Sequence, residues 1–208
     1  MSDYNSLVIT LQNFAAQARA RPLSLGEVVT NLDEAAFALL AIILALPFMQ
    51  PIPLGPFAIA AGFAFIALGW QLFQGLSSPS LPDKVSAIKL QEKSWCAMVK
   101  VCITFIGFWH KLTRPRHQYM VNGTLGRKLK GTILIAGGIL LATPFPVPLP
   151  FNNTMPAIGV LIACIGELEE DGLMVYISII WLSITALLFA GYYFSLWFFG
   201  KEAMTFLN

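Results

Sequence analysis

Four carboxylates crowd into five positions late in the chain, and their types and spacing are those of a charged site. They are Glu167, Glu169, Glu170 and Asp171, four of the eleven acidic residues of the protein. Carboxylates at the C-terminal end of a helix face the negative end of its dipole, so this placement requires compensation. Three interpretations stay open: a solvated helix end, a proton- or cation-coupling site, and salt bridges to a basic segment.

Two proline-rich stretches, 44–56 and 141–153, form the second candidate site. Where a helix stops within a membrane, its free carbonyl and N–H groups can hold a ligand or an ion. The second stretch ends in three residues that are good N-cap types, so plain helix capping is the alternative to ligand binding. The candidate substrate-binding residues are Gln50, Pro51, Pro53, Gln71, Pro148, Pro150, Asn152, Asn153 and Thr154.

The sequence contains no set of nucleophile, base and orienting residue, so we expect a protein that is not an enzyme. His110 and His117 lack partners at metal-ligand spacing, which predicts neither a metal site nor a cofactor. Cys96, Cys102 and Cys164 form no CxxC motif and are predicted to be inert, small apolar side chains. The net charge of +2 is too small to indicate binding to nucleic acid.

The composition is that of a protein partly surrounded by lipid. Hydrophobic residues make up 57% of the chain and charged residues only 12%, with a mean hydropathy of +0.71. Soluble domains carry about 25% charged residues. The charged residues are too few to coat a water-facing surface, which predicts an integral membrane protein with the lipid bilayer as its partner.

The chain reads as two copies of one unit. A shift of 97 residues aligns Pro47 with Pro144 and Gly69 with Gly166 without a gap. The same register aligns Pro51 with Pro148, Pro53 with Pro150, Gly62 with Gly159, and Gly75 with Gly172. Repeats of this kind indicate a duplicated structural unit.

The N-terminal part predicts two helices. Residues 1–22 predict an amphipathic helix, lying on a membrane surface or on the protein, with one apolar face formed by Leu7, Leu11, Phe14, Ala15 and Ala18. Ser24 and Glu27 then have the spacing of a capping box, which begins a second, short helix. No strands are expected.

Each copy predicts two apolar helices joined by a proline-rich break. The first run, 35–48, would be about 21 Å long, short of a hydrocarbon core of about 30 Å. The two runs, 35–48 and 57–73, form either a re-entrant hairpin buried within protein or two short, thinned spans. The irregular backbone favours the re-entrant hairpin, because unpaired backbone groups are tolerated at membrane depth only beside protein or water. The second copy repeats this pattern at 132–143 and 155–165.

The middle segment differs in character. Ten of the thirteen Lys and Arg residues fall between Lys84 and Lys130, which predicts a cytoplasmic location. Within this segment, Trp95–Trp109 is too short for an ordinary span, and an interfacial amphipathic helix is favoured over a crossing. Near the end of the chain, 173–199 carries no charge and predicts a transmembrane helix with an aromatic belt.

Together these patterns predict an all-α integral membrane protein. It would have two repeats, each with a Pro-broken re-entrant hairpin, amphipathic helices, and one long C-terminal transmembrane helix. The expected parts, all within one membrane domain, are the N-terminal helix 1–22, repeat one 23–76, the basic and mostly interfacial segment 77–130, repeat two 131–172, and the transmembrane helix 173–200.

Several motifs also carry a resemblance to a known family. They are Ser24-Leu-Gly-Glu27, Pro47 with Pro51-x-Pro53, Gln71-Leu-Phe-Gln-Gly75, Pro148-Leu-Pro-Phe-Asn-Asn-Thr-Met-Pro-Ala157 and Glu169-Glu-Asp-Gly172. These motifs resemble those of the bacterial ExoD family over roughly Leu23 to Phe199. The resemblance implies a multi-pass protein of the bacterial inner membrane that is linked to exopolysaccharide synthesis.

The interrupted helices at matching positions of two halves favour a small transporter or permease-like protein, with its site at the proline-rich breaks. The alternative is a non-transporting scaffold or accessory protein that binds polysaccharide-synthesis enzymes through its basic middle segment. An enzyme acting on lipid-linked sugars is the least supported class. One chain of this size has few helices with which to surround each buried break, so a homodimer is expected.

Overall fold

The computed structural model describes residues 4–21, 23–50, 54–87, 89–90, 92–110, 113–145 and 151–206. Almost all of these residues are helical, as the apolar periodicity predicts. The helices are α1 (Tyr4–Ala20), α2 (Leu25–Asn31), α3 (Ala35–Ala45), α4 (Pro56–Phe73), α5 (Asp83–Ser86), α6 (Glu92–His110), α7 (Gly123–Ala142), α8 (Thr154–Leu168) and α9 (Gly172–Phe206), with 3-10 turns η1 (Leu46–Met49) and η2 (Gln118–Met120).

The expectation of no strands is wrong in one small detail. A two-residue antiparallel pair joins β1 (Leu23–Ser24) to β2 (Lys89–Leu90). The buried indole of Trp95 donates to the Leu23 carbonyl beside this pair. A pair of this length has no periodic pattern that sequence reasoning could detect.

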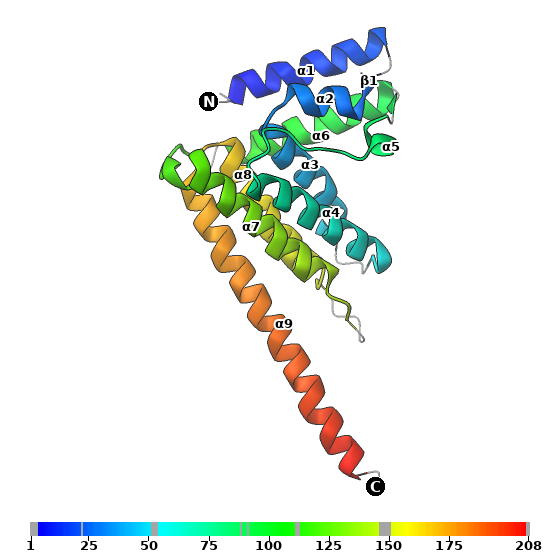
Figure 1. Ribbon diagram of the computed structural model, residues 1–208, viewed down its shortest axis with the longest axis vertical. Helices are drawn as coiled ribbons and strands as arrows, with labels where there is room; N and C mark the ends of the chain where they lie inside the picture. The colour runs from blue at the N-terminus through cyan, green and yellow to red at the C-terminus, as the bar shows by residue number, and fades with distance from the viewer. Residues whose placement is uncertain are drawn as a thin grey trace.

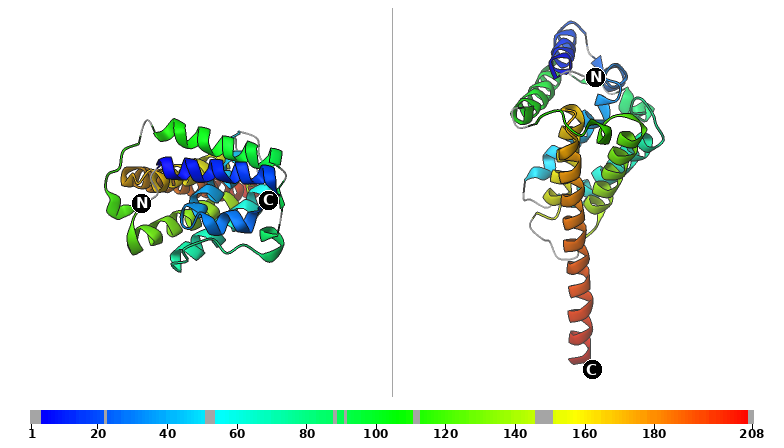
Figure 2. Two further views of the ribbon diagram at one scale, coloured as in Figure 1. Left: turned by 90° about the horizontal axis from the view of Figure 1, so that it is seen from above. Right: turned by 90° about the vertical axis from the view of Figure 1, so that its left-hand side faces the viewer.

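Helix α9 forms the long axis of the molecule, and its C-terminal part extends beyond every other helix (Figure 1). Helices α7 and α8 pack along the half of α9 that begins at Gly172, and α4 and α3 pack in turn on α7 and α8. Helices α1 and α6 lie side by side across that same end (Figure 2). The molecule therefore has a helical bundle with a helical layer lying across one end.

The layer at this end is held by apolar contacts and by one capped helix. The predicted capping box is confirmed: the Glu27 N–H donates to the Ser24 hydroxyl, and the Glu27 carboxylate accepts from the Ser24 N–H. Phe14 and Ala18 of α1 are buried with Trp95 of α6. Both amphipathic helices therefore turn an apolar face toward the protein.

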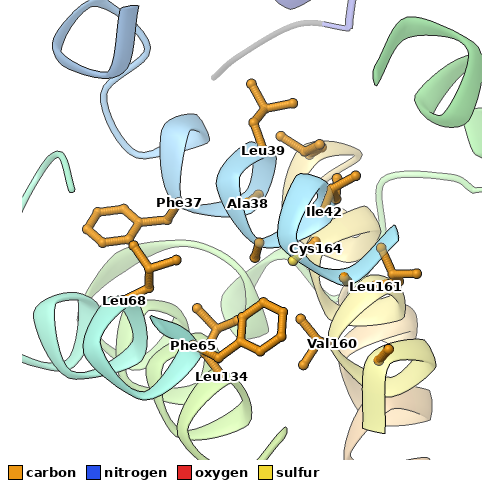
Figure 3. Packing of buried hydrophobic residues seen from close by; sticks show 14 of the residues in the cluster. Phe37, Ala38, Leu39, Ile42, Phe65, Leu68, Leu134, Val160, Leu161 and Cys164 are labelled. Carbon is orange, nitrogen blue, oxygen red and sulfur yellow. The ribbon is translucent and has the colours of Figure 1, made fainter. Parts of the chain in front are cut away.

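The core of the bundle lies where α3 meets α4 and α8. Phe37 and Ile42 of α3, Phe65 of α4 and Val160 of α8 are fully or almost fully buried. Figure 3 shows Phe65 of α4 beside Val160 of α8 and Phe37 beside Leu68 of α4, with Cys164 in the same cluster. The van der Waals contacts within this close-packed cluster hold the helices of the bundle together.

Helices α4 and α7 approach each other closely, and glycines make the approach possible. A Cβ atom at Gly69 would lie 2.5 Å from the Gly131 carbonyl oxygen, and one at Gly131 would lie 2.6 Å from the Gly69 carbonyl oxygen. Gly62 and Gly138 face each other in the same way, at 2.6 Å and 2.5 Å. The helices are antiparallel, and small residues bring their backbones into contact as they do between membrane helices.

The second hairpin differs in length from its prediction. Helix α7 has 20 residues and begins at Gly123, so it includes Lys128 and Lys130, which sequence reasoning placed in the basic segment. It is about 30 Å long, which is the thickness of a hydrocarbon core. The prediction placed the start of this helix at the beginning of the uninterrupted apolar run. The helix begins earlier and includes the charged residues that precede that run.

The end of α7 lies beside the C-terminal half of α9. The Tyr193 hydroxyl donates to the Pro144 carbonyl, and the ring of Phe145 contacts Phe189 at a centroid distance of 4.6 Å. At 1.5 Å per residue, Tyr193 lies about 30 Å along α9 from Gly172. The break that follows α7 is therefore far from the end of the molecule that carries α1 and α6.

Within the part of the chain that the structure describes, two helices are long and apolar enough to cross a membrane. They are α4, over Pro56–Phe73, and α9, over Gly172–Phe198. In the apolar 18-residue stretch of each helix, only 39% and 28% of the residues are buried. Helices that form the core of a soluble protein are mostly buried, whereas these expose large apolar side chains such as Phe57, Leu187 and Phe194. The exposed apolar surface indicates association with a membrane.

Candidate functional site

The acidic cluster lies at the turn between α8 and α9, and it is not solvated. Asp171 is fully buried. Its carboxylate accepts from the Arg116 guanidinium at 3.2 Å, from the Arg114 N–H at 3.2 Å, and from the Leu173 N–H at 3.0 Å. Asp171 therefore caps α9 and holds the chain before α7 against it.

The two neighbouring glutamates contact the same segment of the chain. Glu169 lies 2.5 Å from Nδ1 of His110, and its other carboxylate oxygen, Oε1, is buried without a hydrogen-bond partner among the described residues. Glu170 accepts from the Gln118 amide at 2.9 Å. The interpretation of the cluster as a solvated helix end is thus wrong, and the salt-bridge interpretation describes most of its contacts.

Glu167 has a different environment. Its carboxylate accepts from the Lys130 ammonium at 2.9 Å, and the two side chains are only 9% and 5% exposed. Glu34, the residue before α3, lies 3.9 Å from the same ammonium and is also paired with Arg127. One buried lysine therefore lies within reach of two carboxylates, one on α8 and one just before α3.

A cleft of about 530 Å³ opens beside this ion pair. It lies where the starts of α3 and α7 meet the end of α8, at the end of the bundle covered by α1 and α6. Its polar lining residues are Asp33, Glu34, Asn122, Lys130, Glu167 and Glu170. A buried charged pair that lines an open cleft can exchange partners or protons with what enters it.

The proline-rich breaks lie at the opposite end of the bundle helices, and they touch. The Thr154 hydroxyl donates to the Gln50 carbonyl at 3.2 Å. The Asn153 N–H donates to the Asn152 side-chain carbonyl at 2.9 Å, and Asn153 makes no side-chain capping bond. Of the predicted binding residues, four fall outside the described residues: Pro51, Pro53, Pro148 and Pro150.

Gln71 lies away from both breaks, because it is near the other end of α4. Its amide donates to the Ser80 carbonyl at 3.0 Å and accepts from the Ser80 N–H at 2.7 Å. These two bonds close the loop that follows α4. Gln71 is thus separated from Gln50 and Thr154, with which sequence reasoning grouped it.

Sequence reasoning missed Lys130, Glu34 and Asp33 as members of the charged cleft. One signal was present: the 97-residue register that relates the halves places Asp33 opposite Lys130, each just before an apolar run. Glu167 has Trp70 as its counterpart in that register. The first copy therefore offers no equivalent acidic residue from which the pairing of Glu167 with Lys130 could be predicted.

The cysteines are free, and two of the three are buried. Burial raises the pKa of the Cys102 thiol to about 11, which makes it unreactive near neutral pH. Cys96 is partly exposed. The burial of Cys102 and Cys164 agrees with the expected small apolar side chains, and their inertness stays a prediction.

These features define a helical protein with two candidate membrane-spanning helices and a charged cleft at one end of its bundle. The chain belongs to the ExoD family (Exopolysaccharide synthesis, ExoD), whose family model matches residues 7–191.

Two relatives are similar over most of the chain. Protein ExoD of Rhizobium meliloti is 28% identical over 185 residues, which cover 89% of this chain and 76% of that protein. An uncharacterized protein of Synechocystis sp. is 26% identical over 161 residues, which cover 77% of this chain and 74% of that protein. No solved structure matches this chain.

Proposed function

We propose that this chain supports exopolysaccharide synthesis as a small, proton-coupled transporter of the bacterial inner membrane. The observation that carries the proposal is the buried Lys130–Glu167 pair beside an open cleft, with Glu34 as a second carboxylate 3.9 Å from the lysine. Ionisable groups within a membrane bundle are costly to bury, and they mark ion and proton pathways.

In this mechanism Lys130 moves between two partners. With Glu167 ionised, the ammonium is held at the α7–α8 contact, as it is in the structure. When Glu167 takes a proton from the cleft, its attraction for Lys130 falls, and the ammonium turns toward Glu34. Since Lys130 lies on α7 and its two partners lie on α8 and just before α3, the exchange would shift α7, together with α4 packed on it, relative to α3 and α8.

The opposite end of the bundle supplies the second gate. The Thr154 bond to the Gln50 carbonyl joins the two breaks, and the Tyr193 bond to the Pro144 carbonyl joins the second break to α9. In the proposed cycle the described conformation is open at the charged cleft and closed at the breaks. Gln50, Asn152, Asn153 and Thr154 would then meet the substrate when this contact opens.

We also propose that the two hairpins are repeats of one unit and that they reach deeper than mid-membrane. Helix α4 packs on α7 and α3 packs on α8, so each helix of one hairpin pairs with the non-equivalent helix of the other. Tyr193, which contacts the second break, lies about 30 Å along α9 from Gly172. This depth favours two short spans that reach the headgroups of the far leaflet, rather than a shallow re-entrant loop.

Cysteine labelling tests this arrangement. Cys96 on α6 and a Thr124→Cys variant should both react with a membrane-impermeant maleimide added from the cytoplasmic side, because α6 would lie in the interface. Phe57 lies in the first turn of α4 and is 76% exposed, so a Phe57→Cys variant should react with the maleimide from the other side of the membrane. Labelling of Cys96 and Thr124→Cys from opposite sides would mean that α6 crosses the membrane. Labelling of Phe57→Cys from the cytoplasmic side would instead support a shallow re-entrant hairpin.

A flux measurement tests the transport proposal. Liposomes that contain the purified chain and an internal pH dye should take up protons under an imposed gradient. Glu167→Gln should reduce the uptake to that of protein-free liposomes, whereas Asp83→Asn, at an exposed acid on α5, should leave it unchanged. Uptake that is equal in the two variants would exclude Glu167 as the coupling residue.

The accessory-protein alternative has a different outcome. If the chain carries no flux, a stable partner recovered from membranes and lost in an Arg114→Gln variant would favour a scaffold. The Arg114 side chain is exposed, and only its backbone N–H bonds Asp171, so this variant leaves the cluster intact. A homodimer remains a prediction; the exposed apolar side chains Leu187 and Trp197 of α9 would face either lipid or a second copy.

A further inference from the structure

An apolar groove runs between α3 and α4, away from the charged cleft. The part near the C-terminal end of α4, called its upper part, has a volume of about 770 Å³ and is lined by Leu40, Ala67 and Val85, among others. Its lower part, of about 400 Å³, reaches Phe57 beside the first break. Ile43, Leu44 and Ala64 line both parts, so the groove is continuous.

The groove has the length and position of a binding site for an acyl chain. Along α4 its apolar lining extends from Phe57 to Leu68, about 16 Å at 1.5 Å per residue, and the polar Gln71 lines it one turn further on. One leaflet of a hydrocarbon core about 30 Å thick has nearly the same depth. Helix α4 is a candidate membrane span, so the groove would open sideways to lipid tails.

A polar cleft of about 840 Å³ adjoins the upper end of this groove. It lies between α2 and the loop after α4, and Ser80 and Leu81 line both the cleft and the groove. Its side chains are rich in hydroxyl and amide groups, namely Ser24, Thr30, Gln74, Ser77, Ser78 and Ser86. Among the described residues, the hydroxyls of Ser77, Ser78 and Ser86 have no hydrogen-bond partner, so they are available to a ligand.

The charge of the polar cleft distinguishes between classes of headgroup. Its one charged lining residue is Glu27, which is paired with Arg21 at 2.9 Å. A phosphate would call for an arginine or lysine that can turn to it, whereas the two arginines that contact lining residues, Arg21 at Glu27 and Arg127 at the Gly75 carbonyl, are each paired with a carboxylate. Hydroxyl and amide groups without a cation suit an uncharged headgroup that carries several hydroxyls of its own.

From these two adjoining cavities we infer that the chain binds a membrane lipid with an uncharged sugar headgroup. The sugar occupies the serine-rich cleft, and one acyl chain lies in the groove between α3 and α4. The inference does not rest on transport, since neither cavity includes Lys130, Glu167 or Glu34.

Native mass spectrometry tests the inference on the full chain in a detergent that has no sugar headgroup. The probes are monoglucosyl diacylglycerol, diacylglycerol, phosphatidylethanolamine and phosphatidylglycerol with identical acyl chains. The glucosyl lipid should bind about tenfold more tightly than diacylglycerol, which corresponds to one or two net hydrogen bonds. Equal binding of all four probes, or a preference for phosphatidylglycerol, would overturn the proposal.

Three variants locate the site. Ala67→Phe fills the groove from an exposed position and should remove binding of both the glucosyl lipid and diacylglycerol. Ile59→Phe adds a similar ring to α4 outside the groove and should change neither. Ser77→Ala with Ser78→Ala should remove the preference for the glucosyl lipid and leave binding of diacylglycerol intact. A preference that survives this double change, with the fold intact by thermal melting, would place the headgroup elsewhere.

Discussion

Gly69→Leu is expected to separate α4 from α7 and to be among the most damaging single changes in the chain. The Gly131 carbonyl oxygen lies 2.5 Å from where the new Cβ would stand, and it belongs to helical backbone that cannot turn away. Forcing a side chain into such a contact costs about 3 kcal/mol or more, because the helices have to move apart along their whole length. The loss should appear as a lower thermal midpoint and a smaller monodisperse fraction in mild detergent.

Gly191→Leu is the matched control for this experiment. Gly191 is also a glycine within an apolar helix, yet nothing lies within 4 Å of the position of its Cβ. The control should change stability by less than about 0.5 kcal/mol, as substitutions at open positions do. If both variants behaved alike, close packing of α4 on α7 would not be what stabilises the bundle.

Glu167→Ala is expected to destabilise the protein strongly, because it leaves the buried ammonium of Lys130 without its closest partner. Removing one member of a buried ion pair costs about 3–5 kcal/mol. Glu34, at 3.9 Å from Lys130, can compensate in part and should place the loss near the lower limit. Arg21→Ala, which breaks the exposed pair with Glu27, should lower the thermal midpoint far less in the same assay, because solvent screens that pair.

The double variant Lys130→Met with Glu167→Leu separates stability from function. Replacing a buried ion pair by apolar side chains of similar volume is often neutral or stabilising, so the fold should be recovered. If the pair couples proton movement, the recovered protein should still carry no proton flux and should not restore exopolysaccharide secretion to a strain that lacks this chain. A double variant that is both stable and active would show that the pair is only structural.

These two predictions concern two different faces of α7. Gly131 faces α4, whereas Lys130, one residue earlier, faces α8 and the charged cleft. A change in the partner of Lys130 would therefore act on a helix whose other face is held tightly. In the proposed mechanism α4 and α7 move as one body, and α3 with α8 moves against them.

The sequence by itself determined the helices and their character. The capping box at Ser24, the apolar runs on either side of Pro47 and Pro144, and the long span of α9 were all predicted, and they are present. The reason is that capping, apolar periodicity and chain breaks depend on residues within about one or two turns of each other. The start of α7 was placed too late, because its first turns are charged and carry no apolar signal.

Only the tertiary structure decided which groups meet. The distance in sequence between Glu167 and Lys130, or between Thr154 and Gln50, is bridged by the packing of the hairpins, and no local pattern encodes it. The same packing separated Gln71 from the breaks and left the groove open between α3 and α4. Contacts between distant helices follow from how glycine and apolar surfaces fit in three dimensions, and a single sequence does not show that fit.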